Sequence, residues 1–127
     1  MIRIAVDTNA IADFTRDLRD EPPHLRDAEI LLPLPVVGEL LSGAHQSRQV
    51  ARNLALVDDL LTLWTVLHPT LETARIYGRV RAHLAAELKS SRINDLWIAA
   101  LCLQHDLPLL TNDRGFDSIE GLTVIHW

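Results

Sequence analysis

After Met1 the sequence reads Ile2-Arg3-Ile4-Ala5-Val6-Asp7-Thr8-Asn9, and this stretch sets the first strand and the turn that follows it. Residues 2–6 have the length and apolar character of a buried strand. The short polar side chains after them suit a strand-to-helix turn and a helix N-cap. Asp7 is therefore expected to project from the carboxyl end of a strand, where parallel sheets bind their ligands.

Strand-like and helix-like segments alternate along the rest of the chain. Strands are predicted at 29–32, 64–67, 108–110 and 122–125, and helices at 36–45, 48–61, 70–89 and 93–105, with a loop and a short helix over 16–26. Thr70 is expected to cap the third of these helices. The alternation predicts one α/β domain over residues 1–127, with a central parallel sheet covered by helices on both faces.

Three further acidic residues fall where this fold would bring them near Asp7. Glu39 and Asp95 lie near the starts of predicted helices, and Asp113 follows an apolar run of strand length. A divalent ion that positions water and polarises a phosphodiester needs several hard carboxylate oxygens and open coordination positions. The set predicts hydrolysis of nucleic acid.

The composition fits this hypothesis. The 127 residues, 48% of them hydrophobic, are enough for one compact core, and no apolar stretch approaches the roughly 20 residues of a membrane span. We therefore expect a soluble, cytoplasmic protein without a membrane partner. The net charge of −5 argues against a broad basic footprint for nucleic acid, but four carboxylates in one metal site would account for most of it. The single cysteine, Cys102, lies in an apolar stretch and is expected to be inert packing.

Four motifs, in order, resemble those of PIN-domain ribonucleases. They are Asp7-Thr8-Asn9, Glu39-Leu40-Leu41-Ser42-Gly43, Asn94-Asp95-Leu96-Trp97-Ile98-Ala99-Ala100 and Thr111-Asn112-Asp113. The third motif and the chain length are similar to those of the VapC type, the toxin half of toxin–antitoxin pairs. The resemblance implies a PIN-like three-layer sandwich and an endoribonuclease dependent on Mg²⁺ or Mn²⁺. It also implies an RNA substrate, a VapB-like antitoxin, a homodimer and a toxin–antitoxin hetero-oligomer.

The resemblance further implies roles for single residues. Asp7, Glu39, Asp95 and Asp113 would form the catalytic and metal-binding site, and Thr8, Asn9 and Thr111 would support it. Asp117 could add a carboxylate or face solvent. Asp7 and Asp95 are the strongest candidates for direct ligands, whereas Glu39 and Asp113 could bind directly or through water. Whether one ion or two bind is open. The chain departs from many relatives at Lys89-Ser90-Ser91-Arg92-Ile93, which lacks their glycine and proline.

Two other classes of function are also considered. A phosphatase of the haloacid dehalogenase type would use Asp7 as its nucleophile, but such enzymes carry a second aspartate where this chain has Asn9. A non-catalytic module that binds RNA or a protein partner could keep the fold and cleave nothing. Zinc, glycine-rich phosphate-loop and serine-nucleophile chemistry lack their sequence signatures.

Overall fold

The computed structural model describes residues 2–17, 27–84 and 92–126. Its strands are β1 (Ile2–Val6), β2 (Ala28–Pro33), β3 (Thr65–Leu67), β4 (Leu109–Leu110) and β5 (Val124–Ile125). Its helices are α1 (Thr8–Asp17), α2 (Leu34–His45), α3 (Val50–Leu63), α4 (Leu71–Ala82), α6 (Ile93–Gln104) and the 3₁₀ helix η2 (Arg114–Ser118). Each predicted strand is present, and the predicted segment 16–26 lies outside the described residues except for its first two, which end α1.

The strands form one parallel sheet in the order β3-β2-β1-β4-β5. β1 is central and pairs with β2 on one side and with β4 on the other. The strand order switches direction between β1 and β4, so the ligand crevice of such a sheet is expected at the carboxyl ends of these two neighbours. The Asp7 N–H continues the pairing by donating to the Leu110 carbonyl at 3.0 Å, which fixes Asp7 at the mouth of this crevice.

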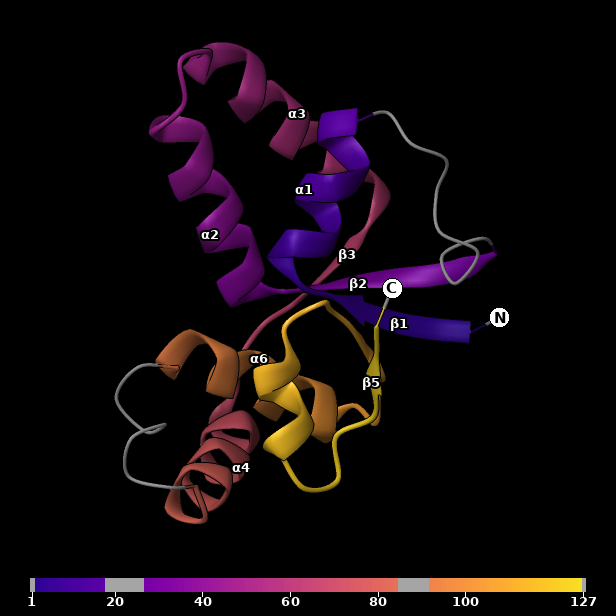
Figure 1. Ribbon diagram of the computed structural model, residues 1–127, viewed down its shortest axis with the longest axis vertical. Coiled ribbons are helices and arrows are strands. Elements are labelled where there is room, and N and C mark those ends of the chain that lie inside the picture. Colours follow the sequence, from indigo (N-terminus) through magenta and orange to yellow (C-terminus); the bar gives the residue numbers. More distant parts are fainter. Residues whose placement is uncertain (1, 18–26, 85–91, 127) are drawn as a thin grey trace.

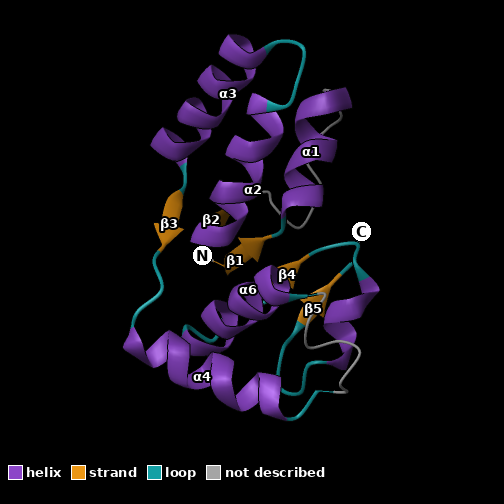
Figure 2. Ribbon diagram, turned by 90° about the vertical axis from the view of Figure 1, so that its left-hand side faces the viewer, coloured by secondary structure: helices purple, strands orange, loops and turns teal. Residues whose placement is uncertain are grey.

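Helices cover both faces of the sheet, as Figures 1 and 2 show from two directions. α1, α2 and α3 lie on one side, and α4 and α6 lie on the other. The predicted three-layer α/β architecture with a central parallel sheet is confirmed. α1 and α2 begin close to the carboxyl end of β1 (Figure 1), and Asn94 in the first turn of α6 contacts Glu39 of α2, so three helices meet near the same edge of the sheet.

Several predicted helix boundaries differ from the structure, including those of α3, which spans Val50–Leu63 and is shifted by two residues from the predicted 48–61. α2 begins at Leu34, two residues before the predicted start, because Pro35 sits in the first turn, where its missing N–H costs nothing. α4 ends at Ala82 and His83 follows as its C-cap, so the predicted helix does not continue through residues 83–84; its predicted residues 85–89 lie outside the described residues. The predicted cap of α4 is confirmed, because Thr70 and Thr73 form a reciprocal capping box.

The core lies between the sheet and its two helical layers. β1 is buried from Ile4 to Val6, and α6 buries most of its length, from Leu96 to Cys102. Burial raises the pKa of the Cys102 thiol to about 12, which keeps it protonated and agrees with its predicted role as packing. Within the described ranges, none of the helices has the length and apolar character needed to cross a membrane.

Candidate active site

Asp7 follows the last residue of β1 and is only 5% exposed. The Thr8 N–H donates to its Oδ1 at 2.8 Å, and the Thr111 hydroxyl donates to its Oδ2 at 2.8 Å. Thr8 belongs to the turn after β1, whereas Thr111 follows β4, so the carboxylate is held from both sides of the switch in strand order. Its two oxygens are oriented before any ligand arrives.

Glu39 projects from the second turn of α2 toward the same edge. The Thr8 hydroxyl donates to its Oε2 at 2.7 Å, and the Asn94 amide lies 3.4 Å from its Oε1. These contacts connect the starts of α1 and α6 to α2. The Asn94-Asp95 pair predicted to occupy the first turn of α6 therefore has separate tasks, since Asn94 contacts Glu39 and Asp95 supplies a carboxylate.

Asp95 and Asp113 share a single cation from the chain itself. The Arg92 NH2 lies 2.8 Å from Asp95 Oδ2 and 3.0 Å from Asp113 Oδ2. The other oxygen of Asp113 accepts from the Gly115 N–H at 2.8 Å and so caps η2, an element that the sequence did not predict. The Asp113 N–H donates to the Thr111 hydroxyl at 3.0 Å, which links this carboxylate to Asp7.

The four carboxylates act on one another electrostatically. Burial raises the pKa of Asp7 above its ordinary value, hydrogen bonds from Thr111 and Thr8 oppose the rise, and the charges of Glu39 and Asp113 add to it. Burial likewise raises the pKa of Asp95 to about 6; Arg92 opposes this, and the other three carboxylates add to it. Such mutual repulsion in a crevice is typical of a site built to hold a cation.

The predicted supporting residues fall into two groups. Thr8 and Thr111 hold the acidic set directly, as described above. The Asn9 Oδ1 atom is buried and has no hydrogen-bond partner among the described residues, which leaves an unused acceptor in the first turn of α1. Among the described residues, Asp117 contacts none of the four carboxylates' partners named above. Its Oδ1 lies 2.9 Å from His126 Nε2, and its Oδ2 lies 3.8 Å from Arg114 Nη1. His126 in turn contacts the Thr111 carbonyl, so Asp117 reaches the site only through His126.

Arg92 is the site residue that the sequence did not reveal. It precedes Asp95 by three residues, the spacing at which side chains meet on one face of a helix, and this was the available signal. Its contact with Asp113 joins residues 21 positions apart and needed the fold to be seen.

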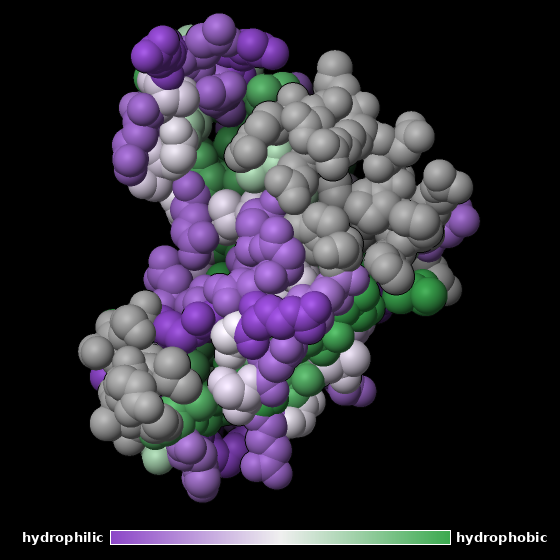
Figure 3. Space-filling view, in the orientation of Figure 1, coloured by the Kyte–Doolittle hydropathy of each residue, from purple (hydrophilic) through white to green (hydrophobic). Residues whose placement is uncertain are grey.

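The surface around the crevice is polar. On the face viewed in Figure 3, hydrophilic side chains gather across the middle, between the part formed by α1 to α3 and the part formed by α4 and α6. As they stand, no three acidic, histidine or cysteine side chains within the described ranges converge closely enough to hold one ion. The carboxylate oxygens are nevertheless the kind of ligand that a hard divalent cation prefers. Two of these carboxylates, Asp95 and Asp113, already pair with the positive charge of Arg92.

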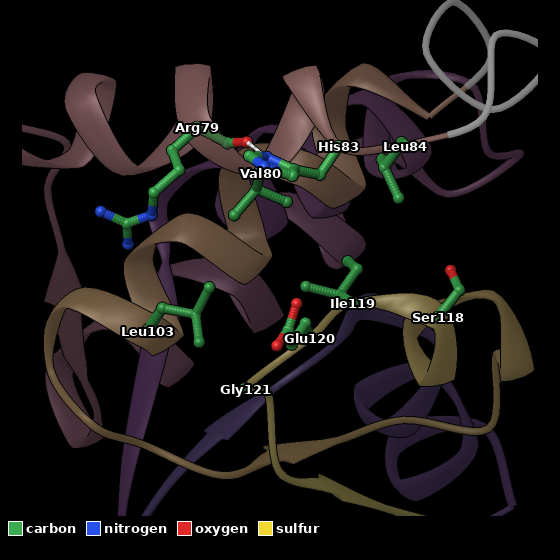
Figure 4. Close-up of a pocket in the computed structure, with 9 residues that line it drawn as sticks. All are labelled: Arg79, Val80, His83, Leu84, Leu103, Ser118, Ile119, Glu120 and Gly121. Carbon is green, nitrogen blue, oxygen red and sulfur yellow. Dashed lines mark hydrogen bonds between the residues drawn. The ribbon is translucent and has the colours of Figure 1, made fainter.

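A cavity of about 480 Å³ lies apart from the acidic set. It is lined by the end of α4, by Leu103 of α6 and by residues 118–121, and Figure 4 shows Val80, Leu103 and Ile119 facing it. The polar contact drawn there, from His83 Nδ1 to the Arg79 carbonyl at 2.7 Å, belongs to the end of α4. None of the four carboxylates lines this cavity, and we assign it no part in the chemistry.

Comparison with known proteins identifies the family. The PIN domain family matches residues 4–122. Ribonuclease VapC5 of Mycobacterium tuberculosis is 38% identical over 90 residues, or 71% of this chain and 64% of that relative, a little under two thirds of its length. Ribonuclease VapC2 of Haemophilus influenzae is 33% identical over 92 residues, which cover 72% of this chain and 70% of the relative.

A solved structure extends the likeness to the whole fold. The crystal structure of VapBC-5 from Mycobacterium tuberculosis, a member of the VapBC family of toxin-antitoxin systems, matches with a TM-score of 0.74 and 27% sequence identity, over 99% of this chain and 98% of that one. The match to the PIN domain family runs from β1 to the segment after η2 and therefore includes all four carboxylates. The chain thus belongs to the PIN-domain family and, within it, to the VapC group.

Proposed function

We propose that residues 1–127 act as a divalent-metal-dependent endoribonuclease, the toxin component of a VapBC-type toxin–antitoxin system. Asp7, Glu39, Asp95 and Asp113 would form its catalytic site and hold the metal. The observation that supports the proposal is that these four carboxylates, from four separate segments, lie within electrostatic range of one another at the edge of the sheet where β1 and β4 end. Membership in the VapC group supports RNA as the substrate, and divalent-metal dependence is general in that group.

The chain's own residues would prepare the site for in-line hydrolysis. A bound divalent ion supplies an activated water and stabilises charge on the leaving oxygen. Asp7 and Asp95 would be direct ligands, and the hydrogen bonds from Thr8 and Thr111 fix the orientation of Asp7 beforehand. Glu39 and Asp113 would bind directly or through water. We propose Mg²⁺ or Mn²⁺ as the ion, because all four donors are hard oxygens.

The phosphatase alternative gains no support. Asn9 stands where a haloacid dehalogenase carries its second aspartate, and the family match is to PIN domains. Both oxygens of Asp7 already accept hydrogen bonds, as expected of an oriented ligand. A binding module without activity is the alternative that experiment must distinguish.

Metal removal gives the first test. We expect purified, antitoxin-free protein to cut a structured RNA pool in the presence of Mg²⁺ or Mn²⁺, to lose that activity in EDTA and to regain it when the ion is returned in excess. Gel analysis of fragment ends would follow the reaction. A folded protein that binds the RNA, cuts nothing and takes up no Mn²⁺ would indicate the binding module instead.

We further propose a VapB-like antitoxin as the protein partner, within a hetero-oligomer that also contains a homodimer of this chain, in the cytoplasm. An apolar groove of about 330 Å³ lies between α1, α2 and α3, with Leu40, Ala44, Leu56, Val57 and Leu60 among its lining residues. α1 and α2 both begin at the acidic site (Figure 1), so a segment seated along them could reach it. This groove is the surface that we assign to the antitoxin.

Substitution within the groove tests this assignment. Leu56 is 41% exposed and lines the groove, whereas Leu63 of the same helix is 75% exposed and lies outside it. We expect Leu56→Arg to abolish co-purification with a co-expressed antitoxin, because an arginine would have to be desolvated against leucines, and Leu63→Arg to leave it intact. Equal retention of the antitoxin by both variants would place the partner elsewhere.

A further inference from the structure

The guanidinium of Arg92 bridges two of the proposed metal ligands. One guanidinium nitrogen, Nη2, lies 2.8 Å from Asp95 Oδ2 and 3.0 Å from Asp113 Oδ2. Only 22% of the Arg92 side chain is exposed, so these ion pairs are screened less by solvent than surface pairs are. Arg92 stands at the N-cap of α6, and its partners come from that helix and from the segment after β4.

The chain provides a fitted seat for this guanidinium. The Arg92 carbon Cζ lies 5.6 Å from the centre of the Phe116 ring, within the range of a cation–π contact. A Cβ added at Gly115 would lie 2.2 Å from that same carbon, so only glycine leaves the guanidinium its space. The backbone of Gly115 is outside the left-handed region, so its conformation does not require glycine. What requires glycine there is the room that the Arg92 guanidinium occupies.

The seated arginine and a divalent ion would require the same oxygens. With Arg92 in place, Asp95 and Asp113 each direct one oxygen to a cation already, and no trio of acidic side chains in the described part of the chain is close enough to chelate. Two cations at these oxygens would also repel each other. Metal binding should therefore require Arg92 to leave its seat.

We propose that Arg92 is a displaceable internal cation, which neutralises Asp95 and Asp113 in the metal-free protein and competes with the divalent ion for them. The proposal rests on the metal-dependent function proposed above and adds a positioning residue to that site. It means that the protein's affinity for metal is set lower than its four carboxylates alone would give.

Two variants free the carboxylates by different routes. Arg92→Ala removes the guanidinium. Gly115→Ala keeps it but fills its seat, and because the crowded atoms are the far end of a flexible side chain, the fold should accept the methyl group. We expect each variant to bind Mn²⁺ roughly tenfold more tightly than the wild type by isothermal titration calorimetry, which corresponds to about 1.4 kcal/mol.

Arg114→Ala is the matched control. This variant also removes one positive charge, from the start of η2. The Arg114 side chain, however, is 79% exposed, and its ion pair with Asp117 is long, at 3.8 Å. Its dissociation constant for Mn²⁺ should stay within about twofold of that of the wild type, since exposed pairs contribute little. A comparable gain in this control would mean that net charge alone sets the affinity and would overturn the proposal.

The outcomes separate this proposal from the nuclease assignment. Unchanged or weaker Mn²⁺ binding in Gly115→Ala would make Arg92 a fixed brace or a helper of the metal, and either result overturns the proposal while leaving the metal site intact. Absence of Mn²⁺ binding in the wild type and in every variant would overturn the metal site itself.

Discussion

Asp7→Asn is expected to abolish RNA cleavage and at the same time to raise the melting temperature of the metal-free protein. The activity falls because an amide is a poor ligand for a hard divalent ion. Mutation of residues that merely orient a ligand typically costs 10–100-fold in affinity or activity, so loss of a ligand should exceed about a hundredfold. Initial rates on a structured RNA pool at fixed Mg²⁺ would measure the fall.

The gain in stability has a separate cause. Asp7 is buried, and its pKa is raised because burial disfavours the charged form. Asparagine has the same shape without the charge; its Oδ1 can accept from the Thr8 N–H while its Nδ2 donates to the Thr111 hydroxyl oxygen. We expect a gain on the order of 1 kcal/mol, or about 4 °C in a chain of this size. Asp58→Asn on the exposed surface of α3 is the control, and it should change neither quantity. A less stable Asp7→Asn protein would mean that the charge of Asp7 supports the fold.

Activity at limiting Mg²⁺ should rise with pH and level off once Asp95 is ionised. Its pKa is about 6, so below pH 6 the carboxylate is protonated and lost as a ligand. Cleavage should fall by about tenfold per pH unit below that point, and saturating Mg²⁺ should move the midpoint to lower pH, because metal binds the deprotonated form. The measurement is a set of rate profiles from pH 5 to 8 at two Mg²⁺ concentrations. A profile that stays flat down to pH 5, or a midpoint that does not respond to Mg²⁺, would contradict this account.

The same carboxylate has the opposite effect on the metal-free fold. Since the pKa of Asp95 is higher in the folded than in the unfolded state, its contribution to stability is full below pH 3.8 and is lost as pH rises through about 6. Metal at neutral pH should restore the loss, because an ion that binds only the folded state stabilises it by mass action. Thermal melts at pH 5 and pH 7.5, with and without Mg²⁺, would show both effects.

Much of the site could be predicted because it sits where short-range sequence signals are strongest. The apolar run of β1 ends sharply at Asp7, and carboxyl ends of parallel strands share one edge, so Asp7 and Asp113 could be placed together from sequence alone. Glu39 and Asp95 could likewise be placed near this edge, because both lie near the starts of predicted helices. The part that escaped prediction depends on tertiary contacts. Asp113 caps η2 by accepting a hydrogen bond from the Gly115 N–H. Arg92 and Asp113 are brought together only by the folded sheet.

Helix ends were harder to predict than helix centres for a related reason. The apolar spacing of Val80 and Leu84 suggested that α4 continues, yet the helix stops at Ala82, where His83 contacts the Arg79 carbonyl. A local side-chain contact at the C-terminus outweighed the periodic pattern, which is common where the last carbonyls of a helix need partners.

The central claim is that the acidic crevice binds a divalent ion and that this ion drives RNA cleavage. The most direct measurement is a titration of Mn²⁺ into wild-type and Asp7→Asn protein, with the same samples assayed for cutting of a structured RNA pool. The account predicts that the wild type binds Mn²⁺ and cuts in proportion to its occupancy, and that the folded variant shows strongly weakened binding and no cutting. Undiminished cutting by Asp7→Asn, or by the wild type in EDTA, would contradict it.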